Sequence, residues 1–135
     1  MESVTVTALV RASREKAWTY FTSPEHITKW NFASDDWHCP HATNDLRVEG
    51  SFSSRMEAKD GGAGFDFEGT YDEVVPNERL TYAFGGRHAT VTFATDGQQT
   101  KVTTVFEPET ENPVDMQRYG WQAILDNFKK HIESA

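Results

Sequence analysis

The sequence contains little cysteine and little positive charge. Cys39 is the only cysteine in 135 residues, which excludes an internal disulfide and leads us to expect a cytoplasmic protein. Lys and Arg total 13 against 21 Asp and Glu, giving a net charge of −8 and a pI near 5.0. A chain this acidic repels phosphate backbones and anionic membranes, so we expect no nucleic-acid partner.

Long apolar runs and motifs of known chemistry are also missing. No stretch of 18 apolar residues occurs, and the first ten residues lack a basic start, so we expect neither membrane insertion nor a signal peptide. There is no phosphate-binding glycine loop, nucleophile elbow or metalloprotease motif, and we predict no cofactor and no catalytic residue. Without repeats or a linker, residues 1–135 are predicted to form a single domain.

The strongest periodic signal lies at the C-terminal end, from Asn112 to Ala135. Asn112 suits an N-cap and Pro113 the first helical position. At 3.6 residues per turn one face carries the apolar side chains Val114, Trp121, Ile124, Leu125, Phe128 and Ile132. A helix of this length would extend roughly 33 Å, so we expect it to cross a broad surface.

The N-terminal part alternates between a strand and short helices. Glu2 to Val10 has the period of two and the β-branched residues of a strand. Helices are predicted from Ser13 to Thr22 and over Glu25–Trp30. Residues 31–43 hold no period and are predicted to form a long loop.

Six further strands are predicted in the second half of the chain. Glycine, asparagine and proline turns separate them, and Phe52, Phe67 and Tyr82 illustrate the aromatic residues that recur at alternate positions. Sequential hairpins of this kind build a curved antiparallel sheet with one aromatic face. The predicted strands are Asp45–Glu49, Ser51–Ala58, Phe65–Val75, Arg79–Phe84, His88–Thr95 and Lys101–Glu107.

This order of one strand, two short helices, six strands and a long helix resembles the START-like, helix-grip superfamily typified by the birch pollen allergen, also called SRPBCC. The chain looks most similar to proteins related to the activator of heat-shock protein 90 ATPase. The resemblance is carried by three stretches: Ala17-Trp18 through Ser23-Pro24-Glu25 to Trp30, Gly69-Thr70-Tyr71 through Pro76 to Glu78-Arg79-Leu80, and Gly120-Trp121 with Leu125 and Phe128. It implies an α+β fold in which a curved sheet of about seven strands wraps around the C-terminal helix. Two positions depart from the family: Trp30 is followed by Asn31 rather than a second tryptophan, and Glu49-Gly50 replaces a glycine pair.

The resemblance also implies a mostly apolar cavity between sheet and helix, and the aromatic face fits it. The predicted ligand-binding residues are Trp30, Phe32, Trp37, Phe52, Met56, Phe67, Tyr71, Tyr82, Phe84, Trp121 and Leu125. His88 is expected near the cavity mouth. Gly120 costs a helix about 1 kcal/mol relative to Ala, so it should leave room for a ligand or permit close contact with the sheet. The alternative is that the aromatic side chains pack against each other and fill the core.

His38, Cys39 and His41 provide nitrogen and sulfur ligands of the kind that zinc prefers. No second cluster at zinc-site spacing completes four ligands, so we predict no metal and an irregular loop with a buried thiol.

Three classes of function fit these observations. We favour a non-catalytic module that binds a small hydrophobic molecule. The first alternative is an enzyme of the polyketide cyclase type, which needs acid and base groups converging in the cavity. The second is a chaperone-partner domain, which needs a protein partner and an exposed complementary surface.

Overall fold

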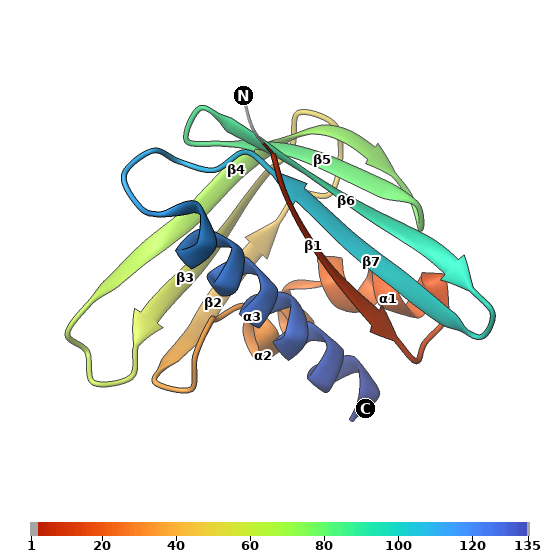
Figure 1. The fold of residues 1–135 in the computed structure, drawn as a ribbon, viewed down its shortest axis with the longest axis horizontal. Helices are drawn as coiled ribbons and strands as arrows, with labels where there is room; N and C mark the ends of the chain where they lie inside the picture. Colours follow the sequence, from red (N-terminus) through yellow and green to blue (C-terminus); the bar gives the residue numbers. More distant parts are fainter. Residues whose placement is uncertain (1–2, 135) are drawn as a thin grey trace.

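The computed structural model describes residues 3–134 and has an α+β fold (Figure 1). All neighbouring strands of its seven-stranded sheet are antiparallel, in the order β1-β7-β6-β5-β4-β3-β2. The elements are β1 (Val4–Val10), α1 (Arg14–Thr22), α2 (Pro24–Trp30), β2 (Trp37–Asn44), β3 (Ser51–Ala58), β4 (Gly64–Val75), β5 (Arg79–Phe84), β6 (Arg87–Asp96), β7 (Gln99–Phe106) and α3 (Val114–Glu133). No helix within residues 3–134 is long and apolar enough to cross a membrane.

The C-terminal helix α3 crosses the concave side of the curved sheet and packs against β1 and α2 (Figure 1). Its buried residues are Leu125, Phe128 and Ile132, which belong to the apolar face that the sequence predicts. The helix-grip prediction is therefore confirmed.

The start of α3 differs from the sequence prediction. Pro113 occupies the N-cap, and the predicted cap Asn112 instead donates hydrogen bonds from its backbone and side-chain nitrogens to the carboxylate of Glu109. The side chain of Gln117 donates to the backbone oxygens of Glu109 and Asn112. These bonds tie the loop before α3 to its first turn. The predicted end of the helix, Ala135, lies outside the described residues.

The first strand and the short helices form as predicted, with small shifts at their ends. In β1 the odd-numbered residues are exposed and Val4, Val6, Ala8 and Val10 are buried, while the predicted start, Glu2, lies outside the described residues. Ser13 caps α1, since its hydroxyl accepts a hydrogen bond from the Lys16 backbone N–H.

The prediction of a loop over residues 31–43 is wrong for its second half, because β2 begins at Trp37. Pro40 and the unusual composition hid this strand. β2 is an edge strand paired only with β3, and its register shifts between His38 and His41. A proline is tolerated there because its missing N–H leaves no ladder bond unmade.

The predicted strand Asp45–Glu49 is also wrong, since these residues form a turn closed by a hydrogen bond from Gly50 N–H to the Arg47 carbonyl. Glu49 has φ +69°, a left-handed conformation that glycine adopts at less cost. Gly50 leaves no space for a side chain, because a Cβ would overlap the Asp45 carbonyl oxygen. The predicted number of strands was thus right, although one was misplaced.

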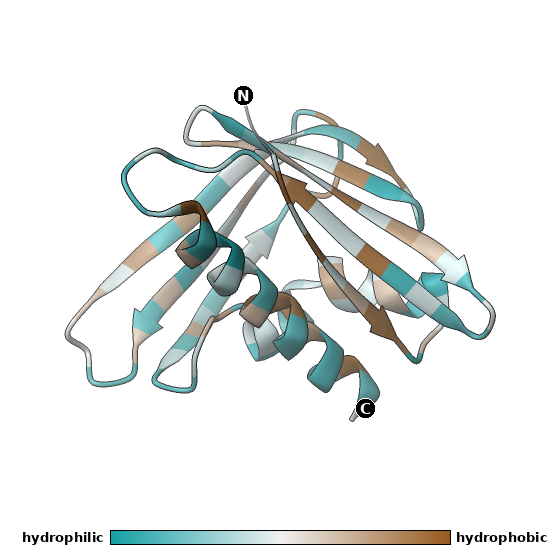
Figure 2. Cartoon of the chain, in the orientation of Figure 1, coloured by the Kyte–Doolittle hydropathy of each residue, from teal (hydrophilic) through white to brown (hydrophobic). Residues whose placement is uncertain are grey.

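The two ends of the interface between sheet and helices are filled differently. Apolar residues form bands across β1, β6 and β7 (Figure 2), where Val10, Val91 and Val102 are fully buried beside Phe128 of α3. This end is a closed core. The other end, beneath the middle of α3, faces β3, β4 and β5 and contains the cavity described next.

Candidate ligand-binding cavity

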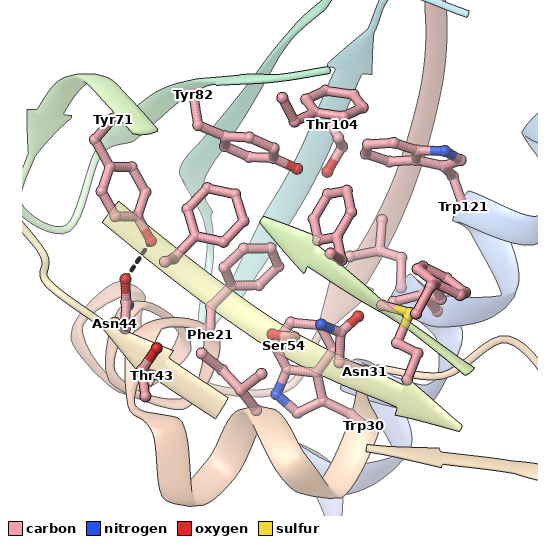
Figure 3. Close-up of a pocket in the computed structure, with 18 of the residues that line it drawn as sticks. Phe21, Trp30, Asn31, Thr43, Asn44, Ser54, Tyr71, Tyr82, Thr104 and Trp121 are labelled. Carbon is pink, nitrogen blue, oxygen red and sulfur yellow. Dashed lines mark hydrogen bonds between the residues drawn. The ribbon is translucent and has the colours of Figure 1, made fainter. Parts of the chain in front are cut away.

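A cavity of about 290 Å³ lies between β3, β4 and β5 of the sheet and the helices α2 and α3 (Figure 3). Its volume is just below the range for small-molecule sites, about 300–1,000 Å³. Nine of its nineteen lining residues are aromatic: Phe21, Trp30, Phe52, Phe65, Phe67, Tyr71, Tyr82, Phe84 and Trp121.

The period of the strands places these rings in the cavity, because alternate side chains of a strand point to the same face. Phe52 of β3 pairs in register with Gly69 of β4, and a Cβ on Gly69 would lie 2.6 Å from Phe52 Cζ. The Phe52 ring therefore covers the surface that the glycine leaves free. Its centroid is 5.1 Å from that of Tyr82 on β5, in an edge-to-face arrangement that aromatic pairs favour.

At the end of the cavity opposite Trp121, a hydrogen bond joins Tyr71 to Asn44 (Figure 3). The Tyr71 hydroxyl donates to Asn44 Oδ1 at 2.6 Å, and Asn44 Nδ2 donates to the Thr22 carbonyl at 2.6 Å. Burial raises the pKa of Tyr71 to about 12 and also raises the pKa of Tyr82. Both phenols are consequently neutral at physiological pH and act as hydrogen-bonding groups.

Other polar groups line the cavity without a hydrogen-bond partner among the described residues. The Tyr82 hydroxyl, the Thr104 hydroxyl and the Asn31 side chain line it and form no hydrogen bond to any residue in 3–134. No side-chain nitrogen or oxygen in this described region is both completely buried and unpaired. These three groups therefore keep some accessible surface, and at their lining positions a ligand or water can pair with them.

The sequence-predicted binding residues separate into two groups. Four of them are not among the lining residues: Phe32, Trp37, His88 and Gly120. The neighbouring Asn31 takes the lining position expected of Phe32, and Trp37 packs against Phe65 with centroids 6.0 Å apart. The structure brings the other nine together around the cavity: Trp30, Phe52, Met56, Phe67, Tyr71, Tyr82, Phe84, Trp121 and Leu125. Their role in binding stays a prediction.

His88 lies on the outer face of the sheet, so its predicted place at the cavity mouth is wrong. The alternation of β6 buries Ala89 and leaves the His88 side chain 57% exposed. Its Nδ1 lies 3.0 Å from Glu107 Oε1, and the hydrogen bonds from His88 lower the pKa of Glu107. The pair stands apart from the cavity volume.

Gly120 does not mediate close packing of the helix. Apart from its own helix backbone and chain neighbours, a Cβ placed on it would meet no atom of residues 3–134 within 4 Å, so the explanation by close contact with the sheet is wrong.

The residues of the His-Cys-His cluster are separated by the strand geometry of β2. Cys39 is buried, its Sγ lies 3.5 Å from the His41 carbonyl oxygen, and burial raises the pKa of the thiol. The His38 ring instead lies 3.7 Å from Glu57. Across residues 3–134, no three His, Cys, Asp or Glu side chains are grouped as metal ligands.

Part of the lining was not predicted from the sequence. Ser54 and Phe65 have the same strand parity as predicted residues and were recognisable from it. Arg87 precedes the predicted start of its strand, Thr43 ends the segment predicted to be a loop, and Asn44 follows that segment. The complete set of missed residues is Phe21, Ile27, Asn31, Thr43, Asn44, Ser54, Phe65, Arg87, Thr104 and Ile124.

A curved sheet, a long helix and an aromatic cavity between them define a START-like protein of the helix-grip class. The family model described as "Activator of Hsp90 ATPase homolog 1-like protein" matches residues 11–133, and the chain belongs to this family. The structure is similar to the solution structure of an AHSA1-like protein from Aeromonas hydrophila, with 40% sequence identity, a TM-score of 0.94 and coverage of 98% of this chain and 93% of the other.

Two further solved structures share the fold. One, from Cytophaga hutchinsonii, is 45% identical, with a TM-score of 0.80 and coverage of 98% of this chain and 91% of the other. The second, from Chromobacterium violaceum, is 26% identical, with a TM-score of 0.87 and coverage of 98% and 99%. No curated protein matches the sequence.

Proposed function

We propose that this protein binds a small, largely apolar molecule in the cavity beneath α3. The observation that carries the proposal is an aromatic cavity of about 290 Å³ in which the Tyr82 and Thr104 hydroxyls have no partner within the described chain. Apolar walls with a few polar groups are characteristic of small-molecule sites. A core filled only by its own side chains would leave neither the volume nor the unpaired hydroxyls.

The chemistry of the lining favours binding over catalysis. Within the described chain the lining contains no carboxylate, imidazole, thiol or lysine. General acid–base catalysis needs a group that exchanges protons near the operating pH. The two tyrosines do not meet this need, because burial raises both of their pKa values.

A test uses one pair of neighbouring residues on β3. Ser54 is 4% exposed and lines the cavity, whereas Ser53 points to the opposite face of the sheet. The Ser54→Leu variant should fill part of the cavity, and Ser53→Leu should not. Neutral apolar probes such as 1-decanol and 2-naphthol should raise the thermal stability of the parent and of Ser53→Leu, but not of Ser54→Leu. At a hundred times its dissociation constant, a ligand adds about 2.7 kcal/mol to the free energy of unfolding.

A chaperone-partner role is the second candidate, and the family description supports it. It predicts that the purified protein changes the ATPase rate of Hsp90, and an unchanged rate at saturating protein would oppose it. A cytoplasmic location stays a prediction from the single cysteine.

A further inference from the structure

Arg87 is the single charged residue among the cavity-lining residues of the described chain. Its presence is unexpected, because the protein carries a net charge of −8 and the rest of the wall is aromatic, aliphatic or neutral polar. Arginine in such a place either pairs with a carboxylate of the protein or remains available to a ligand.

In the part of the chain that the structure describes, the guanidinium of Arg87 is held in position without an ionic partner. Its Cζ lies 4.5 Å from the centroid of the Phe84 ring, and its Nη1 donates to the Glu107 carbonyl oxygen at 2.9 Å. Within residues 3–134 it has no carboxylate oxygen within 4 Å, and its Nε and Nη2 donate to no protein group. The two contacts thus leave donors on the guanidinium that no described residue uses.

The carboxylate of Glu107, the residue whose carbonyl oxygen Arg87 contacts, pairs with His88. The Glu107 carboxylate accepts a hydrogen bond from the His88 backbone N–H at 2.6 Å and lies 3.0 Å from its ring nitrogen. His88 belongs to the outer face of the sheet, so this carboxylate is directed away from the cavity. Glu107 contacts Arg87 through its backbone carbonyl oxygen.

From this arrangement we infer that the bound molecule is a monocarboxylic acid whose carboxylate pairs with Arg87. This inference rests on the proposed function and specifies its ligand. The planar guanidinium presents parallel N–H donors that match a carboxylate, and its stacking on Phe84 fixes that plane. Since Phe84 and Trp121 have ring centroids 5.6 Å apart, the apolar body of the acid lies against them beneath α3.

The test compares acids with neutral molecules of the same shape by isothermal titration calorimetry. Decanoate is paired with 1-decanol, and 2-naphthoate with 2-naphthol, which distinguishes an aliphatic from an aromatic body. The parent should bind at least one acid about tenfold or more tightly than its alcohol. In Arg87→Gln that advantage should disappear while the affinity for the alcohol is retained. The control Arg47→Gln removes a charge that is 69% exposed and pairs with Asp45, so it should preserve the preference for the acid.

The affinity for the alcohol distinguishes failure of the carboxylate inference from failure of the proposed binding function. If alcohols bind the parent but acids bind no more tightly, or if Arg87→Gln retains the preference, the carboxylate inference is wrong and the binding function stands. If neither member of either pair binds the parent, both fail. Arg87→Lys keeps the charge but not the paired donors, and it should show an intermediate preference.

Discussion

The indole of Trp121 stacks on the ring of Phe106, with centroids 4.0 Å apart and planes inclined by 8°. Phe106 belongs to β7 and is 1% exposed, whereas Trp121 belongs to α3 and lines the cavity. The stack therefore joins the closed core to the cavity wall. It fixes the contact between the helix and the sheet at the edge of the cavity.

The core end should be sensitive to loss of volume. Phe128 is completely buried and makes edge-to-face contacts with Phe21 and Trp30. Phe128→Ala should lower the free energy of unfolding by about 3–5 kcal/mol, as large-to-small core changes do. Tyr119→Ala on the same helix, at a position 78% exposed, should change it by less than about 0.5 kcal/mol. Urea denaturation measures both, and equal effects would contradict the assigned packing of α3.

Replacement of Gly120 and of Gly69 by alanine should change the stability of the protein in opposite directions. Gly120 lies in α3 with open space around a Cβ, so Gly120→Ala should stabilise by about 1 kcal/mol through helix propensity. At Gly69 a Cβ would overlap the Phe52 ring and the Ala83 carbonyl oxygen, and Gly69→Ala should destabilise. Thermal and urea unfolding report both signs. A destabilised Gly120→Ala would show that the helix lies closer to its neighbours than described.

The two cavity tyrosines should differ when each loses its hydroxyl. Tyr71→Phe leaves Asn44 Oδ1 without its donor, so it should lower the free energy of unfolding by about 1–3 kcal/mol. Tyr82→Phe removes a hydroxyl that bonds no residue in the described chain and should cost less than about 0.5 kcal/mol. Ligand affinity should show the opposite order. Tyr82→Phe should lower the affinity more than Tyr71→Phe, because the Tyr82 hydroxyl has no partner among the described residues and can bond a ligand. Equal stability of the two variants would argue against the Tyr71–Asn44 bond.

A histidine pair should make stability depend on pH. His26 Nδ1 lies 3.0 Å from His131 Nε2, and burial, followed by His26 and then Lys29, lowers the pKa of His131 below 6.5. The folded protein then binds fewer protons than the unfolded chain, so this contribution is complete above about pH 6.5 and is lost as the pH falls through the folded pKa.

Urea unfolding between pH 7.5 and 5 measures this dependence before carboxylates titrate. The decrease in stability over that interval should be smaller in His131→Gln than in the parent. An identical decrease in the two proteins would remove His131 as its cause.

Much of the fold follows from periodicity alone. The faces of β1 and α3 are long amphipathic patterns, and the hairpins from β4 to β7 are separated by turns such as Gly85-Gly86, where both φ angles are positive. Local chemistry decides these elements. Local chemistry gave the wrong prediction, a loop, for β2. A strand containing Pro40 is possible only at a sheet edge, and position within the sheet is a property of the whole fold.

The cavity was predictable in kind but not in detail. Strand parity identifies Phe52, Phe67 and Tyr82 as inward residues. It gives no information on which ends of the strands the helix covers, which depends on the curvature of the sheet and the Trp121 stack. Arg87 was missed for this reason, since its position near a hairpin turn gave no sign that its guanidinium would lie over Phe84.

The most direct measurement is a crystal structure of the protein with a stabilising ligand bound. We predict ligand density beneath the middle of α3, in contact with Phe84 and Trp121, with the Tyr82 hydroxyl or the Arg87 guanidinium paired to its polar group. Density on the outer surface of the sheet, or a cavity closed by its own side chains while the ligand stabilises the protein, would contradict this prediction.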